Sequence, residues 1–247
     1  MTKKTRKSFT KKKSNNVVRA AFDENEWSPL GNEIDNNRDK KYVKNVKARS
    51  IGQEQLLKLI DEHHLTIASG PAGTGKTYLA ISKAVEALEN GRVDKIILSR
   101  PAMEAGESIG YLPGDLQEKM APFLRPLYDA LGDRMGGRKV KKLIDEGIIE
   151  IAPVGYMRGR TLNNAFVVID EAQNCTYQQI KMLLSRLGWH STMVVTGDPA
   201  QSDLLEGMSG FADIIDKLEA VKKVGIVKLQ SQDIVRHPLV AEMLEVI

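Results

Sequence analysis

From about residue 49 onward, the chain alternates between short apolar runs and longer stretches with apolar residues at helical spacing. Each apolar run lies close to Gly, Asn, Asp or Pro residues, a pattern that predicts buried strands. The clearest helical stretch covers residues 76–88, where an apolar stripe stops at Asn90 and Gly91. Strands that alternate with helices predict an α/β fold in which helices sandwich a mostly parallel sheet. The predicted strands are residues 65–68, 95–99, 148–152, 166–169, 192–196 and 225–229.

The N-terminal part of the chain lacks this pattern and is strongly basic. Residues 1–50 contain 14 Lys and Arg against 6 Asp and Glu, whereas the rest of the chain has a small acidic excess. We therefore expect a disordered basic leader at residues 1–48 and one domain at residues 49–247. Such a leader attracts a polyphosphate chain through counterion release, although a tail that only increases solubility has the same composition.

The overall composition narrows the class of protein. With 247 residues, of which 42% are hydrophobic and 28% charged, the chain can bury the core of an ordinary globular protein. It has no run of 18 apolar residues and no apolar segment near the N-terminus, which argues against a membrane span and against a secretory signal. We expect a cytoplasmic protein. Cys175 is the single cysteine of the sequence, so it cannot form an intrachain disulfide.

A glycine-rich loop is the strongest motif in the sequence. Its pattern, G-x-x-x-x-G-K-T, comes directly after one predicted strand and directly before the clearest helix, as a phosphate-binding loop (P-loop) requires. Its glycines let backbone N–H groups face phosphate oxygens, and the following helix N-terminus adds positive potential. We expect Lys76 to bridge the β- and γ-phosphates of ATP, and the Thr77 hydroxyl to ligate Mg²⁺. The loop consists of Gly70, Pro71, Ala72, Gly73, Thr74, Gly75, Lys76 and Thr77.

Two further polar motifs follow apolar runs. Asp170 and Glu171 come directly after the run 166–169, at the strand end where open α/β sheets bind ligands. Adjacent acids at such a position also cap helices. In combination with the P-loop they predict that Asp170 holds Mg²⁺ through a water molecule and that Glu171 polarises the attacking water. Gln201 belongs to a G-D-P-A-Q sequence after another predicted strand, where its amide would sense the γ-phosphate or orient the water.

The order of G-x-x-x-x-G-K-T, D-E-A-Q and G-D-x-x-Q resembles the first RecA-like domain of superfamily 1 helicases. Further blocks make the chain similar to the PhoH family of ATPases, which occurs in bacteria and their phages, and the resemblance covers about residues 49–247. It implies a RecA-like P-loop NTPase core, ATP hydrolysis with Mg²⁺ and a connection with RNA. The blocks that carry it are residues 99–107, 110–120, 157–162 and 233–238.

The resemblance also implies roles for residues around the nucleotide. Gln53 corresponds to the glutamine with which helicases read adenine, since a carboxamide can pair with N6 and N7 of that base. Arg236 corresponds to an arginine on the γ-phosphate, where a guanidinium neutralises transition-state charge. Arg158 and Arg160 have three open interpretations: contact with RNA, action on the nucleotide of a neighbouring subunit, or pairing with acids of their own surface. The four histidines show no ligand spacing, so we assign no metal beyond Mg²⁺.

Three functions remain compatible with the sequence. The favoured one is an ATPase that binds or remodels single-stranded RNA. Helicases use two RecA lobes and this sequence has room for one, so we expect a homo-oligomeric ring, such as a hexamer, and no nuclease domain. The second is a nucleotide-switched RNA-binding or scaffold protein with little turnover. The third is a small-molecule P-loop kinase, which Glu171 and the G-D-x-x-Q element disfavour.

Overall fold

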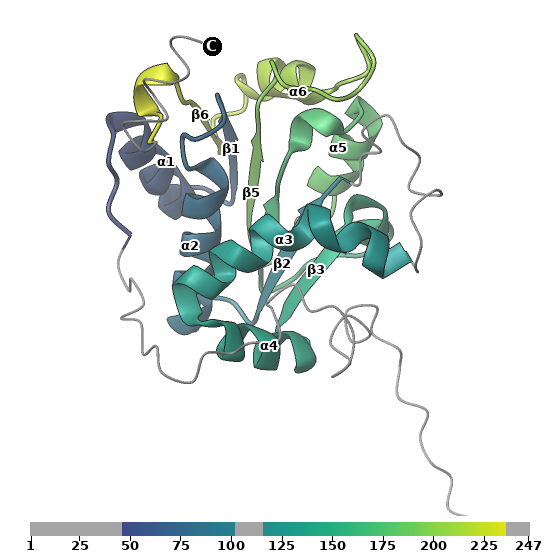
Figure 1. Cartoon of the computed structure of the whole chain (residues 1–247). Helices are drawn as coiled ribbons and strands as arrows, with labels where there is room; N and C mark the ends of the chain where they lie inside the picture. Colours follow the sequence, from purple (N-terminus) through teal and green to yellow (C-terminus); the bar gives the residue numbers. More distant parts are fainter. Residues whose placement is uncertain (1–45, 102–115, 236–247) are drawn as a thin grey trace, which may run out of the picture.

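Six parallel strands form the centre of the protein (Figure 1). The structure is a computed structural model that describes residues 46–101 and 116–235. The strand order across the sheet is β3-β2-β4-β5-β1-β6, and every neighbouring pair is parallel. The strands are β1 Leu65–Ser69, β2 Lys95–Arg100, β3 Ile149–Pro153, β4 Ala165–Ile169, β5 Thr192–Gly197 and β6 Val224–Lys228.

The observed strands confirm the predicted α/β class and the parallel sheet. Each predicted strand end lies within one residue of the observed bound, and the predicted helix at 76–88 is α2, Lys76–Glu89. The predicted and observed bounds agree because strands that are buried on both faces have continuous apolar sequences. Most of the basic leader lies outside the described residues, and the division into leader and domain stays a prediction.

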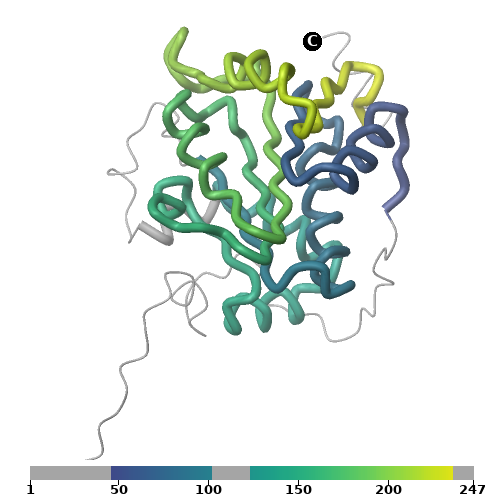
Figure 2. The backbone as a smooth tube through the Cα atoms, turned by 180° about the vertical axis from the view of Figure 1, so that it is seen from behind, coloured from purple at the N-terminus to yellow at the C-terminus, as the bar shows by residue number. Residues whose placement is uncertain are grey.

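Helices cover both faces of the sheet (Figures 1 and 2). Two of them begin with side-chain caps: Ser50 accepts from the Gln53 backbone N–H, and Thr176 accepts from the Gln179 backbone N–H. Across the described ranges, no helix combines the length and the hydropathy that crossing a membrane requires. The remaining α-helices in these ranges are α1 Ile51–Glu62, α3 Leu116–Met135, α4 Gly137–Asp145, α5 Tyr177–Leu184 and α6 Phe211–Leu218.

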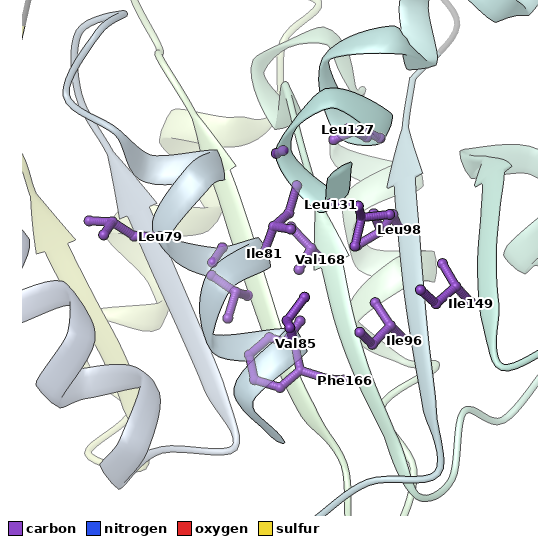
Figure 3. Packing of buried hydrophobic residues seen from close by; sticks show 14 of the residues in the cluster. Leu79, Ile81, Val85, Ile96, Leu98, Leu127, Leu131, Ile149, Phe166 and Val168 are labelled. Atoms are coloured by element: carbon purple, nitrogen blue, oxygen red, sulfur yellow. The ribbon is translucent and has the colours of Figure 1, made fainter. Parts of the chain in front are cut away.

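The sheet separates two apolar cores. All five residues of β4 are buried, and successive side chains of a strand point to opposite faces. Phe166 and Val168 therefore pack in the core that includes residues of α2 and α3 (Figure 3), whereas Val167 and Ile169 pack in the core on the side of α5 and α6. Because each core takes alternate residues of the same strands, the register of β4 fixes which side its terminal residues face.

Parallel alignment places all the carboxyl ends of the strands at one edge of the sheet. The P-loop follows β1, and Asp170 follows β4. β5 lies between these two strands and pairs with both of them. The fold thus brings the ends of three strands, far apart in sequence, to one place, as expected for an open α/β sheet.

The buried Ile96 of β2 provides a test of how tightly the first core is packed. Ile96 is fully buried (Figure 3), whereas Ile51 at the start of α1 is 74% exposed. Ile96→Val should lower the free energy of unfolding by about 0.5–1.5 kcal/mol, since it removes one buried methyl group. Ile51→Val, the same chemical change on the surface, should change it by less than about 0.5 kcal/mol. Urea titration followed by circular dichroism measures both, and equal effects would contradict the packing described.

Candidate nucleotide site

The P-loop curls between the end of β1 and the start of α2. Gly70 and Gly75 both have positive φ, 141° and 81°. A Cβ added at Gly70 would lie 2.3 Å from the backbone oxygen of Leu229, so a side chain there collides with the backbone beside β6. The Gly70 N–H donates to the carbonyl of Gly197 at 3.2 Å. The loop is thereby tied to the end of β5, and glycine is required where it approaches its neighbour.

Lys76 begins α2 and folds over the loop that precedes it. Its Nζ donates to two P-loop carbonyls, of which the Pro71 oxygen lies at 2.8 Å, and the residue is buried. Burial lowers the pKa of Lys76 below its usual value. Three carboxylates, those of Asp198, Glu171 and Asp170, act in the opposite direction. The ammonium is thus held inside the loop and faces an acidic group of side chains.

Asp170 joins the P-loop helix to the centre of the sheet. Its Oδ1 accepts from the Thr77 hydroxyl at 2.6 Å and from the Thr196 hydroxyl at 2.8 Å. The structure therefore brings together the two residues that the sequence nominated for Mg²⁺, Thr77 and Asp170. Their oxygens fit that ion, which favours hard oxygen ligands and is usually held by one or two protein groups together with water and phosphate. Thr196, at the end of β5, had no assigned role in the sequence interpretation.

Glu171 has an uncommon backbone conformation, and each oxygen of its carboxylate has a partner. Its φ is 52°, a left-handed value that is rare outside glycine. One carboxylate oxygen, Oε1, lies 3.0 Å from a guanidinium nitrogen of Arg100, and the other, Oε2, accepts from Gln173 Nε2 at 2.6 Å. The side-chain oxygen of Gln173, Oε1, accepts in turn from the Asp198 N–H at 3.0 Å. Sequence reasoning did not assign roles to Arg100 and Gln173, although both lie inside the motifs that carried the resemblance.

Gln201 lies on the loop that follows β5. Its N–H donates to the Asp198 carbonyl at 3.0 Å, and its own carbonyl accepts from Gln173 Nε2 at 3.4 Å. The residue is exposed. The backbone of Gln201 is therefore anchored to the same network as Glu171, while its side chain is accessible from outside.

A pocket of about 680 Å³ opens beside the P-loop. Gln53 lines it, and the buried carboxamide of this residue is tied to the backbone: Nε2 donates to the Thr74 oxygen at 3.0 Å, and Oε1 accepts from the Arg49 N–H at 2.8 Å. Tyr78, a residue that is 36% exposed, contributes an aromatic ring. The backbone N–H of Val235, which also lines the pocket, donates to the Gly73 carbonyl at 3.0 Å. Apolar walls and few polar groups are typical of a base-binding pocket.

The three arginines nominated from the sequence have different positions. Arg160 forms a bidentate ion pair with Glu150, in which NH2 donates to Oε2 at 2.7 Å. Within the part of the chain that the structure describes, this supports the surface-pair interpretation for Arg160. Arg158 is exposed and has no side-chain partner among the described residues. Arg236 lies outside the described residues and directly follows Val235.

Comparisons with known proteins agree on one family. The family profile described as PhoH-like protein matches residues 45–247. A PhoH-like protein of Bacillus subtilis is 52% identical over 203 residues, which are 82% of this chain and 64% of that protein. A PhoH-like protein of Mycobacterium tuberculosis is also 52% identical over 203 residues, and Protein PhoH of Escherichia coli is 45% identical over 205 residues; in both cases 82% of this chain and 58% of the relative are covered. The chain therefore spans about three fifths of the length of these relatives.

A solved structure of the large terminase of a thermophilic bacteriophage aligns with 79% of this chain and 49% of that chain, at 13% identity and a TM-score of 0.49.

The hydroxyl of Thr196 provides a test of the buried network around Asp170. Thr196→Val keeps the shape of the side chain and removes a hydrogen bond to a buried carboxylate, so the free energy of unfolding should fall by about 1.5–3 kcal/mol. Thr192, at the start of the same strand, has no side-chain hydrogen bond within the described residues. Thr192→Val should therefore change stability by less than about 0.5 kcal/mol. Urea unfolding of both variants measures the difference, and an unchanged Thr196→Val protein would contradict the network.

Proposed function

Because this chain belongs to the PhoH-like family, we propose that it binds ATP with Mg²⁺ at the carboxyl edge of its sheet and hydrolyses the γ-phosphate. One observation carries the proposal: Thr77 of the P-loop helix and Asp170 at the end of β4 meet at 2.6 Å, next to Glu171. A hydroxyl and a carboxylate at this separation suit one Mg²⁺, and the adjacent carboxylate suits a water on the far side of the γ-phosphate. Catalysis of this kind depends mainly on position and charge.

Each residue of the site then has a separate task. Lys76 neutralises charge on the β- and γ-phosphates, after leaving the loop carbonyls to which it now donates. Thr77 and Asp170 hold Mg²⁺, which withdraws charge from the phosphate oxygens when bound. Glu171 accepts the proton of the attacking water. Gln201 orients that water or senses the γ-phosphate, from a loop whose backbone is linked to Gln173.

The base of the nucleotide fits the pocket beside the P-loop. Tyr78 offers a ring face for stacking, and Gln53 offers the hydrogen-bonding capacity that its two backbone contacts leave unused. We assign adenine to this pocket on the family resemblance. Arg236 is proposed to reach the γ-phosphate of its own subunit, since the preceding residue, Val235, lies against the P-loop.

Single-stranded RNA is the proposed macromolecular partner, and a ring of identical subunits the proposed assembly. The basic leader and the exposed guanidinium of Arg158 support contact with a polyanion. Arg160, which Glu150 already neutralises, is less suited to this contact or to acting on a neighbour's nucleotide. Arg158 is therefore the better candidate for either role.

A second function is favoured by a specific observation. Both carboxylate oxygens of Glu171 are engaged, by Arg100 and by Gln173. These contacts fix the direction of the carboxylate, and a nucleotide-switched RNA-binding protein is the alternative in which that direction suits the attacking water only after a partner rearranges the site. ATPase rates measured with and without single-stranded RNA distinguish the two functions, because an intrinsic ATPase is active in both conditions.

Lys76 and Glu171 should differ in their effects on binding and turnover. Lys76→Ala should weaken both, because the lysine contacts phosphate in the ground state and in the transition state. Glu171→Gln should retain ATP and slow hydrolysis on the order of 10²- to 10⁴-fold, since only proton transfer is lost. Fluorescent nucleotide titration and phosphate release measure the two properties. Glu62→Gln, an exposed glutamate at the end of α1, is the matched control; wild-type turnover in Glu171→Gln would remove this residue from the mechanism.

The leader should contribute to RNA affinity without contributing to sequence preference. Deletion of residues 2–13, which removes seven cations and no acid, should weaken binding equally for different RNA sequences. Each lost phosphate contact should reduce the slope of log K against log salt by about 0.7. Filter binding at several salt concentrations measures this slope. ATPase without RNA is the internal control and should not change; an unaltered slope would assign the leader a solubilising role only.

A further inference from the structure

Arg100 lies where β2 ends, at the same edge of the sheet as the P-loop. One guanidinium nitrogen is 3.0 Å from Oε1 of Glu171, and the other is 3.8 Å from Oδ2 of Asp170. The side chain is only 20% exposed. β2 pairs directly with β4, so the strand that ends at Arg100 is adjacent to the strand that the two acids follow. The guanidinium thus contacts both carboxylates that follow β4.

The contacts of Glu171 define the direction of its carboxylate without exhausting its capacity to accept. Arg100 binds Oε1 and Gln173 binds Oε2 at 2.6 Å. A carboxylate has about four lone-pair positions, so two hydrogen bonds leave about two for a water molecule. The planar fork of a guanidinium fixes orientation more strictly than the ammonium of a lysine does. The two donors therefore restrict the rotation of the group and leave it able to bind water.

Charge provides a second reason for a cation at this position. Asp170 and Glu171 are adjacent in sequence, and Asp198 is close enough to raise the pKa of Lys76. A single ammonium on the P-loop side faces these three carboxylates, and like charges at short range repel one another. Without Arg100, the least buried of the acids, Glu171, with a side chain 35% exposed, would turn away toward solvent or toward Lys76.

We propose that Arg100 is a positioning residue for Glu171: it holds the carboxylate in the direction from which a water molecule can be deprotonated. The inference rests on the proposed role of Glu171 in hydrolysis. It assigns no contact between Arg100 and the nucleotide. Loss of the guanidinium should misplace the carboxylate of Glu171, the general base, and leave nucleotide binding intact.

The test separates turnover from binding in the full chain. Arg100→Ala should lower kcat on the order of 10²-fold, the effect of displacing a catalytic group by about 1 Å. KM for MgATP should stay close to that of the wild type, because the lost interaction acts only in the transition state of the chemical step. Arg100→Lys keeps the charge but loses the fork, and its kcat should lie between those of Arg100→Ala and the wild type.

Arg92, in the turn that precedes β2, supplies a matched control. It also contacts two carboxylates, Glu86 at 3.0 Å and Asp61 at 3.7 Å, and it lies away from the P-loop edge. Arg92→Ala should leave kcat and KM unchanged. If Arg100→Ala fails to fold, as judged by circular dichroism, Arg100→Lys and the Arg92 control carry the test, with a reduced kcat at unchanged KM as the expected result.

A double-mutant cycle with Glu171→Gln decides how Arg100 acts. Once the Glu171 carboxylate is absent, removal of Arg100 should not lower the hydrolysis rate further. The double variant should therefore hydrolyse ATP at the rate of Glu171→Gln, which single-turnover measurements with labelled ATP determine. Independent, multiplicative losses in the two single variants would overturn the proposal. An Arg100→Ala variant with a raised KM at constant kcat would also overturn it, because that result indicates direct nucleotide binding. So would an Arg100→Ala variant whose kcat and KM equal those of the wild type. Wild-type turnover of Glu171→Gln alone would instead refute the proposed function of that glutamate.

Discussion

The contact between Thr77 and Asp170 is the interaction on which the arrangement of the site depends. It joins the first turn of α2 to the residue that follows β4, although β5 separates β1 from β4 in the sheet. Thr196 of β5 donates to the same carboxylate oxygen, so the intervening strand also takes part in the connection. Three strand ends are thereby held together by hydroxyl donors around one buried carboxylate. Buried charges are stable only when such donors are present.

A second constraint is the balance of charge around this carboxylate. The site concentrates three acids near Lys76, and burial lowers the pKa of that lysine while the acids oppose the change. Arg100 supplies a balancing positive charge on the side of Glu171, and the Gln173 amide donates a hydrogen bond to the same carboxylate. A group of side chains built in this way suits a ligand that carries both phosphates and a divalent cation, because the cation interacts with the acids and the phosphates with the lysine.

Individual residues show where sequence interpretation stops. Arg158 and Arg160 were equivalent in the sequence, two residues apart in one motif. Tertiary structure distinguishes them, because β3 presents Glu150 to Arg160 and no described side chain to Arg158. Gln53 shows the same limit. Its position in the motif order indicated a contact with the base, whereas the structure gives its carboxamide two backbone partners, of Arg49 and Thr74, as well as a place on the pocket wall.

The sequence by itself determined the class of the fold and the strands within one residue. It also located the P-loop with Lys76 and Thr77, and the acidic pair Asp170 and Glu171 that follows β4. These features are encoded locally: buried parallel strands require uninterrupted apolar runs, and a phosphate loop requires glycines at fixed spacing before a helix. Only the tertiary structure decided that Thr196 shares Asp170 with Thr77, and that Arg100 and Gln173 hold Glu171. Those contacts depend on strand order and register, which place residues from separate parts of the chain side by side and leave no signature in the local pattern.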